Sequence, residues 1–229
     1  MAWTGRLLQR QNCDNGFEIL RIDAGNASAR AKPGCMASLG DAAYPVMRAS
    51  SDMGWIEILT PQNAWQWPSG TAETITLLDG HAFTPSPERP IVLAVGNRLG
   101  LAPMVFLCDS LRRGSNVRIT VLLGERHTFP FRPAPSRLIV PGLPAHVIAT
   151  MPLLEDWHIA CRLALPNERA GCHEGFAWEL AEMWLAGADT RLPQTIVYIS
   201  GDTPFCDRMT RLCERFAVAC QIAPMSRPG

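Results

Sequence analysis

Three short glycine-containing turns, each after an apolar run, hold the residues of this chain best suited to bind an anion. The turns span residues 96–103, 124–126 and 201–203, and the first and third lead into predicted helices over 104–112 and 206–215. A glycine turn between a strand and a helix directs the first free N–H groups of the helix at whatever lies above it, often a nucleotide phosphate. An ordinary strand–helix connection without a ligand has the same pattern, so one such turn alone does not show that an anion is bound.

The order of the predicted elements indicates an α/β domain in the second part of the chain. Strands are predicted over 91–95, 117–124, 147–149, 158–165 and 195–199, a further helix over 177–185, and a long proline-rich loop over 130–144. Strands that alternate with helices favour a parallel, doubly wound sheet, whose ligands lie at the carboxyl ends of the strands. We therefore expect the three turns to open on one edge of the sheet.

The first third of the chain has a different pattern. Short alternating runs at 17–22, 54–59 and 74–78 are separated by Gly, Pro, Asn and Asp, which is typical of a small antiparallel barrel. We predict an antiparallel β-barrel domain over residues 1–86 and an α/β domain over residues 87–229. The cleft between two such domains is a natural ligand site.

Composition narrows the possible partners. The 229 residues carry a formal net charge of zero and are 47% hydrophobic, so no basic patch for nucleic acid is expected. No apolar run is long enough to span a bilayer, and residues 1–11 lack the apolar centre of a signal peptide, which predicts a cytoplasmic protein without a membrane partner. The eight cysteines form no Cys-x-x-Cys pair, so reduced thiols are expected and a metal site is not.

Five motifs occur in a fixed order along the chain. They are Lys-Pro-Gly-Cys-Met at 32–36, Gly-Asn-Arg-Leu-Gly-Leu-Ala-Pro at 96–103, Leu-Leu-Gly-Glu-Arg at 122–126, Gly-Cys-His-Glu-Gly-Phe at 171–176 and Ser-Gly-Asp-Thr-Pro at 200–204. This series resembles the ferredoxin–NADP reductase superfamily, most closely the electron-transfer subunit of class 1B dihydroorotate dehydrogenase, over nearly the whole chain. The resemblance implies a FAD-binding-type barrel, an NAD(P)-binding-type α/β domain, and electron transfer from NAD(P)H through FAD to a protein redox partner or catalytic subunit.

The same resemblance places a dinucleotide around the three turns. Asn97 and Arg98 stand where the family has glycines, which allow positive φ and close approach of a pyrophosphate, and arginine tolerates positive φ less well than asparagine. Arg98 either pairs with a phosphate or fills the emptied pocket. Glu125 would favour the ribose hydroxyl of NAD and Arg126 the 2′-phosphate of NADP, unless the two form an exposed ion pair without a ligand. The implied nucleotide-binding residues are Gly96, Asn97, Arg98, Gly100, Leu101, Ala102, Pro103, Gly124, Glu125, Arg126, Gly201, Asp202 and Thr203.

Asp202 departs from the family at the third turn. It replaces a proline, and its negative charge would disfavour a phosphate-bearing ligand nearby. Asp202 or Thr203 is also a good N-cap for the helix that follows, and Pro204 suits its first turn. Simple helix capping is therefore the alternative to a role in binding.

The flavin strand of the family reads approximately Arg-Pro-x-Ser, and it corresponds here to Tyr44-Pro45-Val46-Met47. A cation is thereby lost at Tyr44 and a hydrogen bond at Met47. Arg48 lies one residue further on, so it points to the opposite face of the strand unless the strand slips or bulges. Tyr44, Pro45, Met47 and Arg48 are the candidate flavin contacts. The candidate phosphate turns, 60–65 and 68–71, fit the family pattern poorly.

Two functions stay open at this stage. In the resembled subunit four cysteines follow the last strand and hold a [2Fe–2S] cluster, whereas here 219–225 leads to 226–229 without them, so no cluster is expected. No histidine accompanies a recognisable nucleophile, and no catalytic side chain is predicted. The chain is then either an NAD(P)H-dependent flavin reductase-type electron-transfer subunit, or a degenerate reductase-fold protein that has lost its cofactors and acts as a binding or scaffolding subunit.

Overall fold

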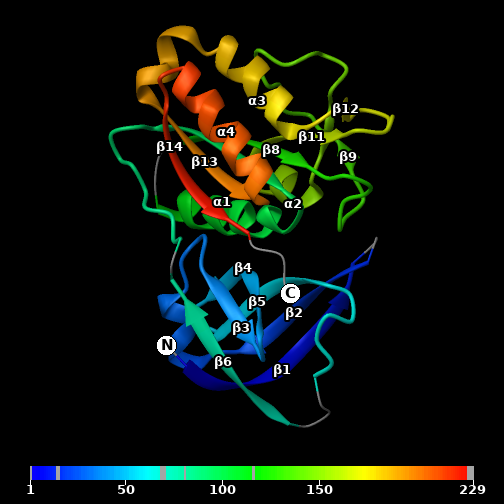
Figure 1. Ribbon diagram of the computed structural model, residues 1–229, viewed down its shortest axis with the longest axis vertical. Coiled ribbons are helices and arrows are strands. Elements are labelled where there is room, and N and C mark those ends of the chain that lie inside the picture. The colour runs from blue at the N-terminus through cyan, green and yellow to red at the C-terminus, as the bar shows by residue number, and fades with distance from the viewer. Residues whose placement is uncertain (1, 14–15, 68–70, 80, 115–116, 226–229) are drawn as a thin grey trace.

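Two parts of the chain are visible in Figure 1, a β-barrel followed by an α/β sandwich. The computed structural model describes residues 2–13, 16–67, 71–79, 81–114 and 117–225. Residues 68–70 of the candidate phosphate turn at 68–71, and the last residues, 226–229, lie outside the described residues.

Six antiparallel strands close the barrel in the order β1-β2-β5-β4-β3-β6. They are β1 (Ala2–Asn12), β2 (Phe17–Asp23), β3 (Met36–Leu39), β4 (Ala42–Ser50), β5 (Trp55–Pro61) and β6 (Ala72–Leu78), with a short 3-10 helix at Gly25–Arg30. The alternation in β2 buries Leu20 and Ile22 completely inside the barrel, as expected for a strand with one face in the core. The predicted barrel is confirmed. The alternating runs correspond to β2, β5 and β6, whereas β1, β3 and β4 were not revealed by alternation; most side chains of β1 are exposed on both faces.

The second part is a parallel sheet of six strands in the order β12-β11-β8-β7-β13-β14. Its elements are β7 (Ile91–Asn97), α1 (Leu101–Gly114), β8 (Arg118–Gly124), α2 (Pro152–Asp156), β11 (Ala160–Leu165), β12 (His173–Glu174), α3 (Ala177–Ala186), β13 (Thr195–Gly201), α4 (Thr203–Arg215) and β14 (Ala219–Pro224). Short 3-10 helices lie at Arg98–Gly100 and Asp189–Gln194, and β9 (Ala134–Pro135) pairs with β10 (Ala149–Thr150) in a separate small sheet.

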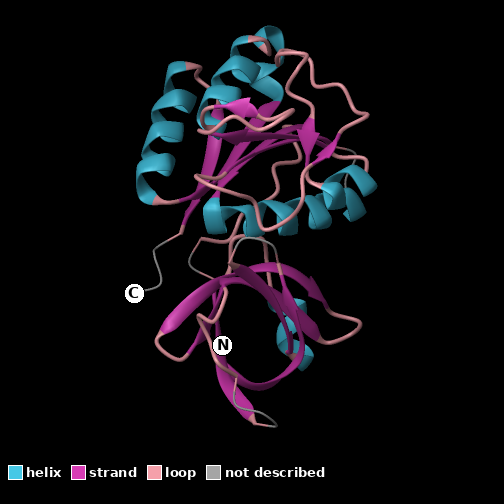
Figure 2. Cartoon of the chain, turned by 90° about the vertical axis from the view of Figure 1, so that its right-hand side faces the viewer, coloured by secondary structure: helices cyan, strands magenta, loops and turns pink. Residues whose placement is uncertain are grey.

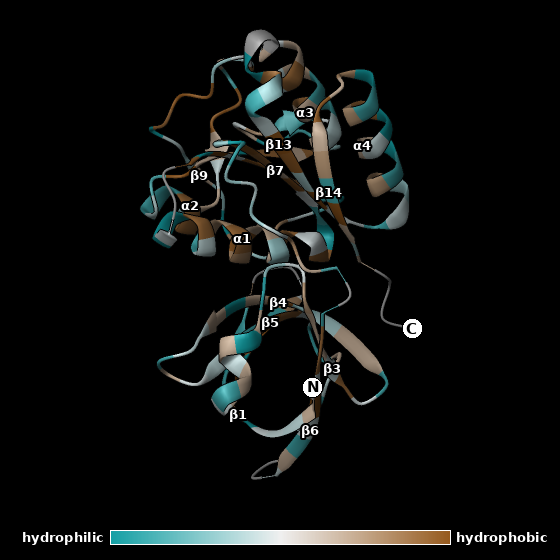
Figure 3. Cartoon of the chain, turned by 90° about the vertical axis from the view of Figure 1, so that its left-hand side faces the viewer, coloured by the Kyte–Doolittle hydropathy of each residue, from teal (hydrophilic) through white to brown (hydrophobic). Residues whose placement is uncertain are grey.

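Helices cover both faces of the parallel sheet, which confirms the doubly wound arrangement. Figure 2 shows helices between the sheet and the barrel and others on the far side of the sheet. Val92 and Ala94 of β7 pack in the core with α1, whereas Leu93 and Val95 pack in the core with α3 and α4. A strand buried on both faces is apolar throughout rather than alternating. Figure 3 accordingly shows the central strands β7 and β13 as largely hydrophobic.

Two predicted strands need correction. The strand predicted over 147–149 is reduced to the two residues of β10, Ala149–Thr150. The strand predicted over 158–165 begins only at Ala160, because α2 precedes it and His158, with φ of 58°, ends the turn that follows that helix. The sequence did not predict α2, whose five residues are too few to show a helical period.

The barrel and the α/β part pack directly against each other. Phe106 of α1 lies in the core of the barrel, whereas Met47 and Leu59 of the barrel lie in a core cluster of the α/β part. The Tyr198 hydroxyl of β13 donates a hydrogen bond of 2.9 Å to the Thr84 carbonyl oxygen in the connecting segment. The proposed domain boundary at residue 86 falls in this segment. No helix among the described residues is long and apolar enough to cross a bilayer.

Cysteine chemistry offers a test of the packing at the end of the chain. Each of the eight cysteines is a thiol rather than part of a disulfide, and no cluster of metal-ligating side chains exists among the described residues. The Cys213 thiol of α4 donates a hydrogen bond to Cys220 of β14 and thereby lowers the pKa of the Cys220 thiol. A lower pKa gives a larger thiolate fraction near neutrality.

We therefore expect alkylation of Cys220 by iodoacetamide to reach its half-maximal rate at a lower pH than that of an ordinary thiol. In the Cys213→Ala variant this midpoint should move upward, as measured by peptide mass spectrometry across a pH series. An unchanged midpoint in that variant would contradict the hydrogen bond.

Candidate functional site

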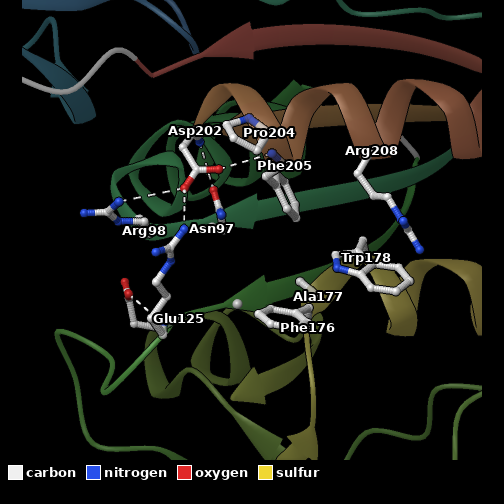
Figure 4. A pocket seen from close by; sticks show the side chains of 12 residues that line it. Asn97, Arg98, Glu125, Phe176, Ala177, Trp178, Asp202, Pro204, Phe205 and Arg208 are labelled. Atoms are coloured by element: carbon white, nitrogen blue, oxygen red, sulfur yellow. Dashed lines mark hydrogen bonds and ion pairs between the residues drawn. The ribbon is translucent and has the colours of Figure 1, made fainter. Parts of the chain in front are cut away.

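The three turns meet at the carboxyl edge of the parallel sheet, as the sequence predicts. Parallel pairing sets Gly96 beside Ser200 on one side, and Asn97 beside Gly124 on the other. Above these strand ends lies a pocket of about 230 Å³, shown in Figure 4. Its lining comes from all three turns and from the starts of α3 and α4: Asn97, Arg98, Gly124, Glu125, Arg126, Phe176, Ala177, Trp178, Asp202, Pro204, Phe205 and Arg208.

The glycines of the first and third turns serve close packing of the two turns. A Cβ atom at Gly100 would lie 2.2 Å from the Ser200 carbonyl oxygen, and one at Gly201 would lie 1.9 Å from the Asn97 Oδ1 atom. Both distances are far below van der Waals contact. These glycines therefore hold the first turn against the end of β13.

The nucleotide candidates separate into two groups. Asn97, Arg98, Gly124, Glu125, Arg126 and Asp202 line the pocket. Gly96, Gly100, Leu101, Ala102, Pro103, Gly201 and Thr203 do not line it, and the run from Gly100 to Pro103 is buried. The reason is that α1 begins at Leu101 and its first turn enters the core immediately.

Asn97 and Arg98, which stand where the resembled family has two glycines, adopt different backbone conformations. Asn97 is extended, with φ of −129°, and its side-chain oxygen accepts a hydrogen bond of 3.1 Å from the Asp202 N–H. Arg98 takes the left-handed conformation, with φ of 52°. That conformation costs a residue with a Cβ atom about 1–2 kcal/mol. The position that needs a glycine most is therefore the one that carries an arginine.

Asp202 is the electrostatic centre of the pocket. Its Oδ1 atom accepts a hydrogen bond of 3.1 Å from the Phe205 N–H, which confirms Asp202 as the N-cap of α4. Its Oδ2 atom lies 3.8 Å from the Arg98 guanidinium and 3.8 Å from that of Arg126. Figure 4 shows the Arg98 side chain directed at this carboxylate. The chain's own carboxylate thus stands between two cations at a helix N-terminus.

Glu125 adds a second carboxyl group to the same side of the pocket. Its Oε1 atom accepts a hydrogen bond of 2.8 Å from the Arg126 N–H. Burial raises the pKa of the Glu125 carboxyl, and this hydrogen bond and the nearby Arg98 oppose the rise. Glu125 therefore lies close to the cations without forming the exposed ion pair with Arg126 that the sequence left open.

The opposite side of the pocket is aromatic, and the sequence analysis did not predict it. The Arg208 guanidinium stacks over the Trp178 ring at 4.0 Å, and Phe176 lies stacked beside Trp178 with ring centroids 6.2 Å apart. Phe176 is 46% exposed. Flat aromatic faces next to a cation are suited to stack a planar base. The motif at 171–176 was noted in the sequence, but nothing in it showed that its last residue would face the third turn.

The flavin candidates lie elsewhere, on β4 of the barrel: Tyr44 belongs to the barrel core, whereas Met47 packs against the α/β part. Tyr44 is 2% exposed, and its hydroxyl donates a hydrogen bond of 3.5 Å to the Ala64 carbonyl oxygen. Pro45 is also buried. A β-bulge between Val46 and Arg48 shifts the register against β5. Because of this bulge, Met47 and Arg48 both border a second pocket of about 330 Å³.

The residues present do not fit FAD in the manner of the family motif. Tyr44 supplies no cation, and the apolar Met47 supplies no hydrogen bond. Arg48 does reach the second pocket, and its buried Nε atom has no hydrogen-bond partner within the described part of the chain. Its guanidinium, however, lies 3.6 Å from the Glu57 carboxylate, which also pairs with Arg21 at 2.6 Å. One cation shared with a carboxylate does not replace the lost pair of contacts.

No family model and no curated protein matches the sequence. Comparison with solved structures gives clear matches across the whole chain. The ferredoxin reductase in carbazole 1,9a-dioxygenase has a TM-score of 0.71 and 14% sequence identity, and the match covers 98% of this chain and 69% of that one. The chain has the ferredoxin reductase-like fold.

Two further solved structures with this fold are proteins named for FAD and NAD(P). The flavohem-like FAD/NAD binding domain of nitric oxide dioxygenase from Vibrio cholerae O1 biovar El Tor has a TM-score of 0.67 at 16% identity and covers 97% of this chain and 98% of its own. A ferredoxin NADP+ reductase from Neisseria gonorrhoeae with bound FAD and NADP has a TM-score of 0.60 at 12% identity, with 97% and 98% covered. At such identities the likeness establishes the fold alone.

Proposed function

We propose that the chain is a nucleotide-binding protein of the reductase class, which binds NAD(P) at the carboxyl edge of its parallel sheet and serves electron transfer to a protein partner. The observation that carries this proposal is the convergence of Arg98, Arg126 and Arg208 with an aromatic wall on one pocket. Guanidinium groups are the side chains best suited to bind phosphates, and Phe176 and Trp178 offer faces for the base.

The residues of this pocket fit NAD(P) in chemistry. When bound, NAD(P)H would supply a hydride from its nicotinamide ring, and electron transfer would then require a flavin acceptor held by contacts other than those of the family motif. The chain's own contribution would be to hold the phosphates with Arg98 and Arg126 and to stack the base near Trp178. At about 230 Å³ the pocket is smaller than the roughly 300–1,000 Å³ of common small-molecule sites, so it would enclose part of the dinucleotide.

A second candidate function, that of a binding or scaffolding subunit, is favoured by the residues of β4 that stand where the resembled family has its flavin strand. Tyr44 and Met47 remove the two contacts that the family motif would give to FAD, and this points to a reductase-fold protein that acts as a binding or scaffolding subunit without flavin. The two proposals differ in one readily measured property. A flavin-bound protein is yellow, with an absorbance band near roughly 450 nm that belongs to the cofactor itself.

The first test is therefore spectroscopy and thermal unfolding of the purified chain. A ligand at a hundred times its Kd adds about 2.7 kcal/mol to the free energy of unfolding. For a chain of this size that corresponds to a rise in Tm of roughly 5–11 °C. We expect NADH or NADPH to give such a rise in Tm. If the purified protein is colourless, it binds no flavin, and the scaffold alternative is favoured. Absence of any shift with either nucleotide would contradict nucleotide binding.

The Arg126→Ala variant distinguishes the two nucleotides. We expect it to weaken the binding of both nucleotides, NADPH about tenfold and NADH less, because this guanidinium would meet the pyrophosphate of both but a 2′-phosphate only in NADPH. The matched control is Arg137→Ala, which removes the same charge from a side chain that is 92% exposed and outside the pocket. Equal losses for both nucleotides would show that Arg126 does not meet the 2′-phosphate.

A further inference from the structure

We propose that Asp202 controls the affinity of this pocket for phosphate groups, because its carboxylate occupies as an internal anion the place between Arg98 and Arg126 that a ligand phosphate would take. The inference rests on the proposed function, since it concerns the same pocket. The Asp202 Oδ2 atom lies 3.8 Å from both guanidinium groups, and the Asp202 side chain is 20% exposed.

The Asp202 carboxylate already interacts with all three groups that would attract an anion here: the N-terminus of α4, Arg98 and Arg126. The N-terminus of α4 carries a partial positive charge, and Asp202 already accepts a hydrogen bond from its Phe205 N–H. Arg98 and Arg126 supply two full charges on the outer side. A phosphate that enters the pocket must compete with the carboxylate for all three, and it also meets the repulsion of the carboxylate itself.

The side chains around Asp202 leave room for this exchange. Arg126 is 59% exposed and Arg98 is 35% exposed, so both can turn from the carboxylate to a ligand without leaving the protein surface. Among the described residues that line the pocket, Glu125 is the other acidic one, and its carboxylate accepts the hydrogen bond of the Arg126 N–H. Asp202 is therefore the carboxylate that contacts both arginines and the N-terminus of α4.

The structural role of Asp202 can be separated from this electrostatic role. Asparagine caps a helix about as well as aspartate, whereas alanine loses about 1 kcal/mol of capping. The Asp202→Asn variant therefore keeps the cap of α4 and removes only the charge. Asp202→Ala removes both, so it should lower Tm while it raises phosphate affinity as Asp202→Asn does.

The test is isothermal titration calorimetry in about 0.1 M salt with inorganic pyrophosphate, ADP and adenosine as probes. We expect Asp202→Asn to bind pyrophosphate and ADP about tenfold more tightly than the wild-type chain, equivalent to about 1.4 kcal/mol. Adenosine, which has no phosphate, should bind equally to both. Glu214→Gln is the charge-matched control, because Glu214 is exposed near the other end of α4, roughly 18 Å away along the helix axis.

Every outcome bears on the proposal. Tighter binding by Asp202→Asn but not by Glu214→Gln supports it. If the wild-type chain binds no nucleotide while Asp202→Asn binds pyrophosphate, the inference stands and the proposed NAD(P) function fails. The inference is overturned if Asp202→Asn binds pyrophosphate no more tightly than the wild-type chain, or if neither protein binds pyrophosphate. In either case the proposed function survives if the wild-type chain binds ADP.

Discussion

Replacing Gly100 with alanine is expected to lower the free energy of unfolding by about 3 kcal/mol, equivalent to a fall in Tm of roughly 6–12 °C. The added Cβ atom would lie 2.2 Å from the Ser200 carbonyl oxygen and 2.7 Å from the Gly201 nitrogen. Both neighbours are backbone atoms of the adjacent turn, so they cannot move aside as a flexible side chain would. The first turn must shift away from β13, and the pocket built on both turns should lose its shape.

A second glycine of the same segment provides the control. Gly114, the last residue of α1, has nothing within 4 Å of an added Cβ atom. Gly114→Ala should therefore be neutral or stabilise the chain by about 0.5–1 kcal/mol, since alanine is the better helix former. Urea denaturation of both variants measures the difference. A Gly100→Ala variant as stable as Gly114→Ala would show that the two turns are not packed as described.

Replacing Phe106 with alanine is expected to cost about 3–5 kcal/mol, because a large aromatic side chain is lost from a filled core. Phe106 is 5% exposed and projects from α1 into the barrel core. Its loss should therefore loosen the barrel as well as the α/β part. Urea denaturation gives the free energy of unfolding, and amide hydrogen exchange of β3 and β4 shows where the protection is lost.

Leu111→Ala is the matched variant on the same helix. Leu111 is 6% exposed and packs in the core of the α/β part. It should cost about 2–5 kcal/mol, so global stability falls in both variants, but local protection of the barrel strands should fall more in Phe106→Ala. Identical exchange patterns would mean that α1 does not join the two parts.

The two candidate functions depend on different parts of the molecule. The α/β part keeps a pocket with three arginines and an aromatic wall, which supports NAD(P) binding. In the barrel, Tyr44 and Met47 stand where the flavin strand of the resembled family has an arginine and a serine, and they supply neither a cation nor the serine's hydrogen bond. Measurement of bound flavin is the decisive observation.

Local signals in the sequence were enough to predict the architecture. The apolar runs that end in glycine at β7, β8 and β13 predict parallel strands, and parallel strands bring their carboxyl ends to one edge. Pattern and turn chemistry likewise predict α3, α4 and an N-cap at Asp202 or Thr203, because a helix and its N-cap depend on residues a few positions apart. Exposed β1 and the short α2 lacked a periodic signal, so their strand and helix were not predicted.

The electrostatics of the pocket depended on contacts between residues far apart in the chain. Nothing near Asp202 in the sequence shows that its carboxylate would face both Arg98 and Arg126, or that Phe176 and Arg208 would complete the wall. The bulge that turns Arg48 toward the second pocket depends on its register with β5. Sequence alone determined which elements form and which edge carries the site, because those follow from local spacing. Only the tertiary structure decided which charges meet, because that depends on how separate strands are set against one another.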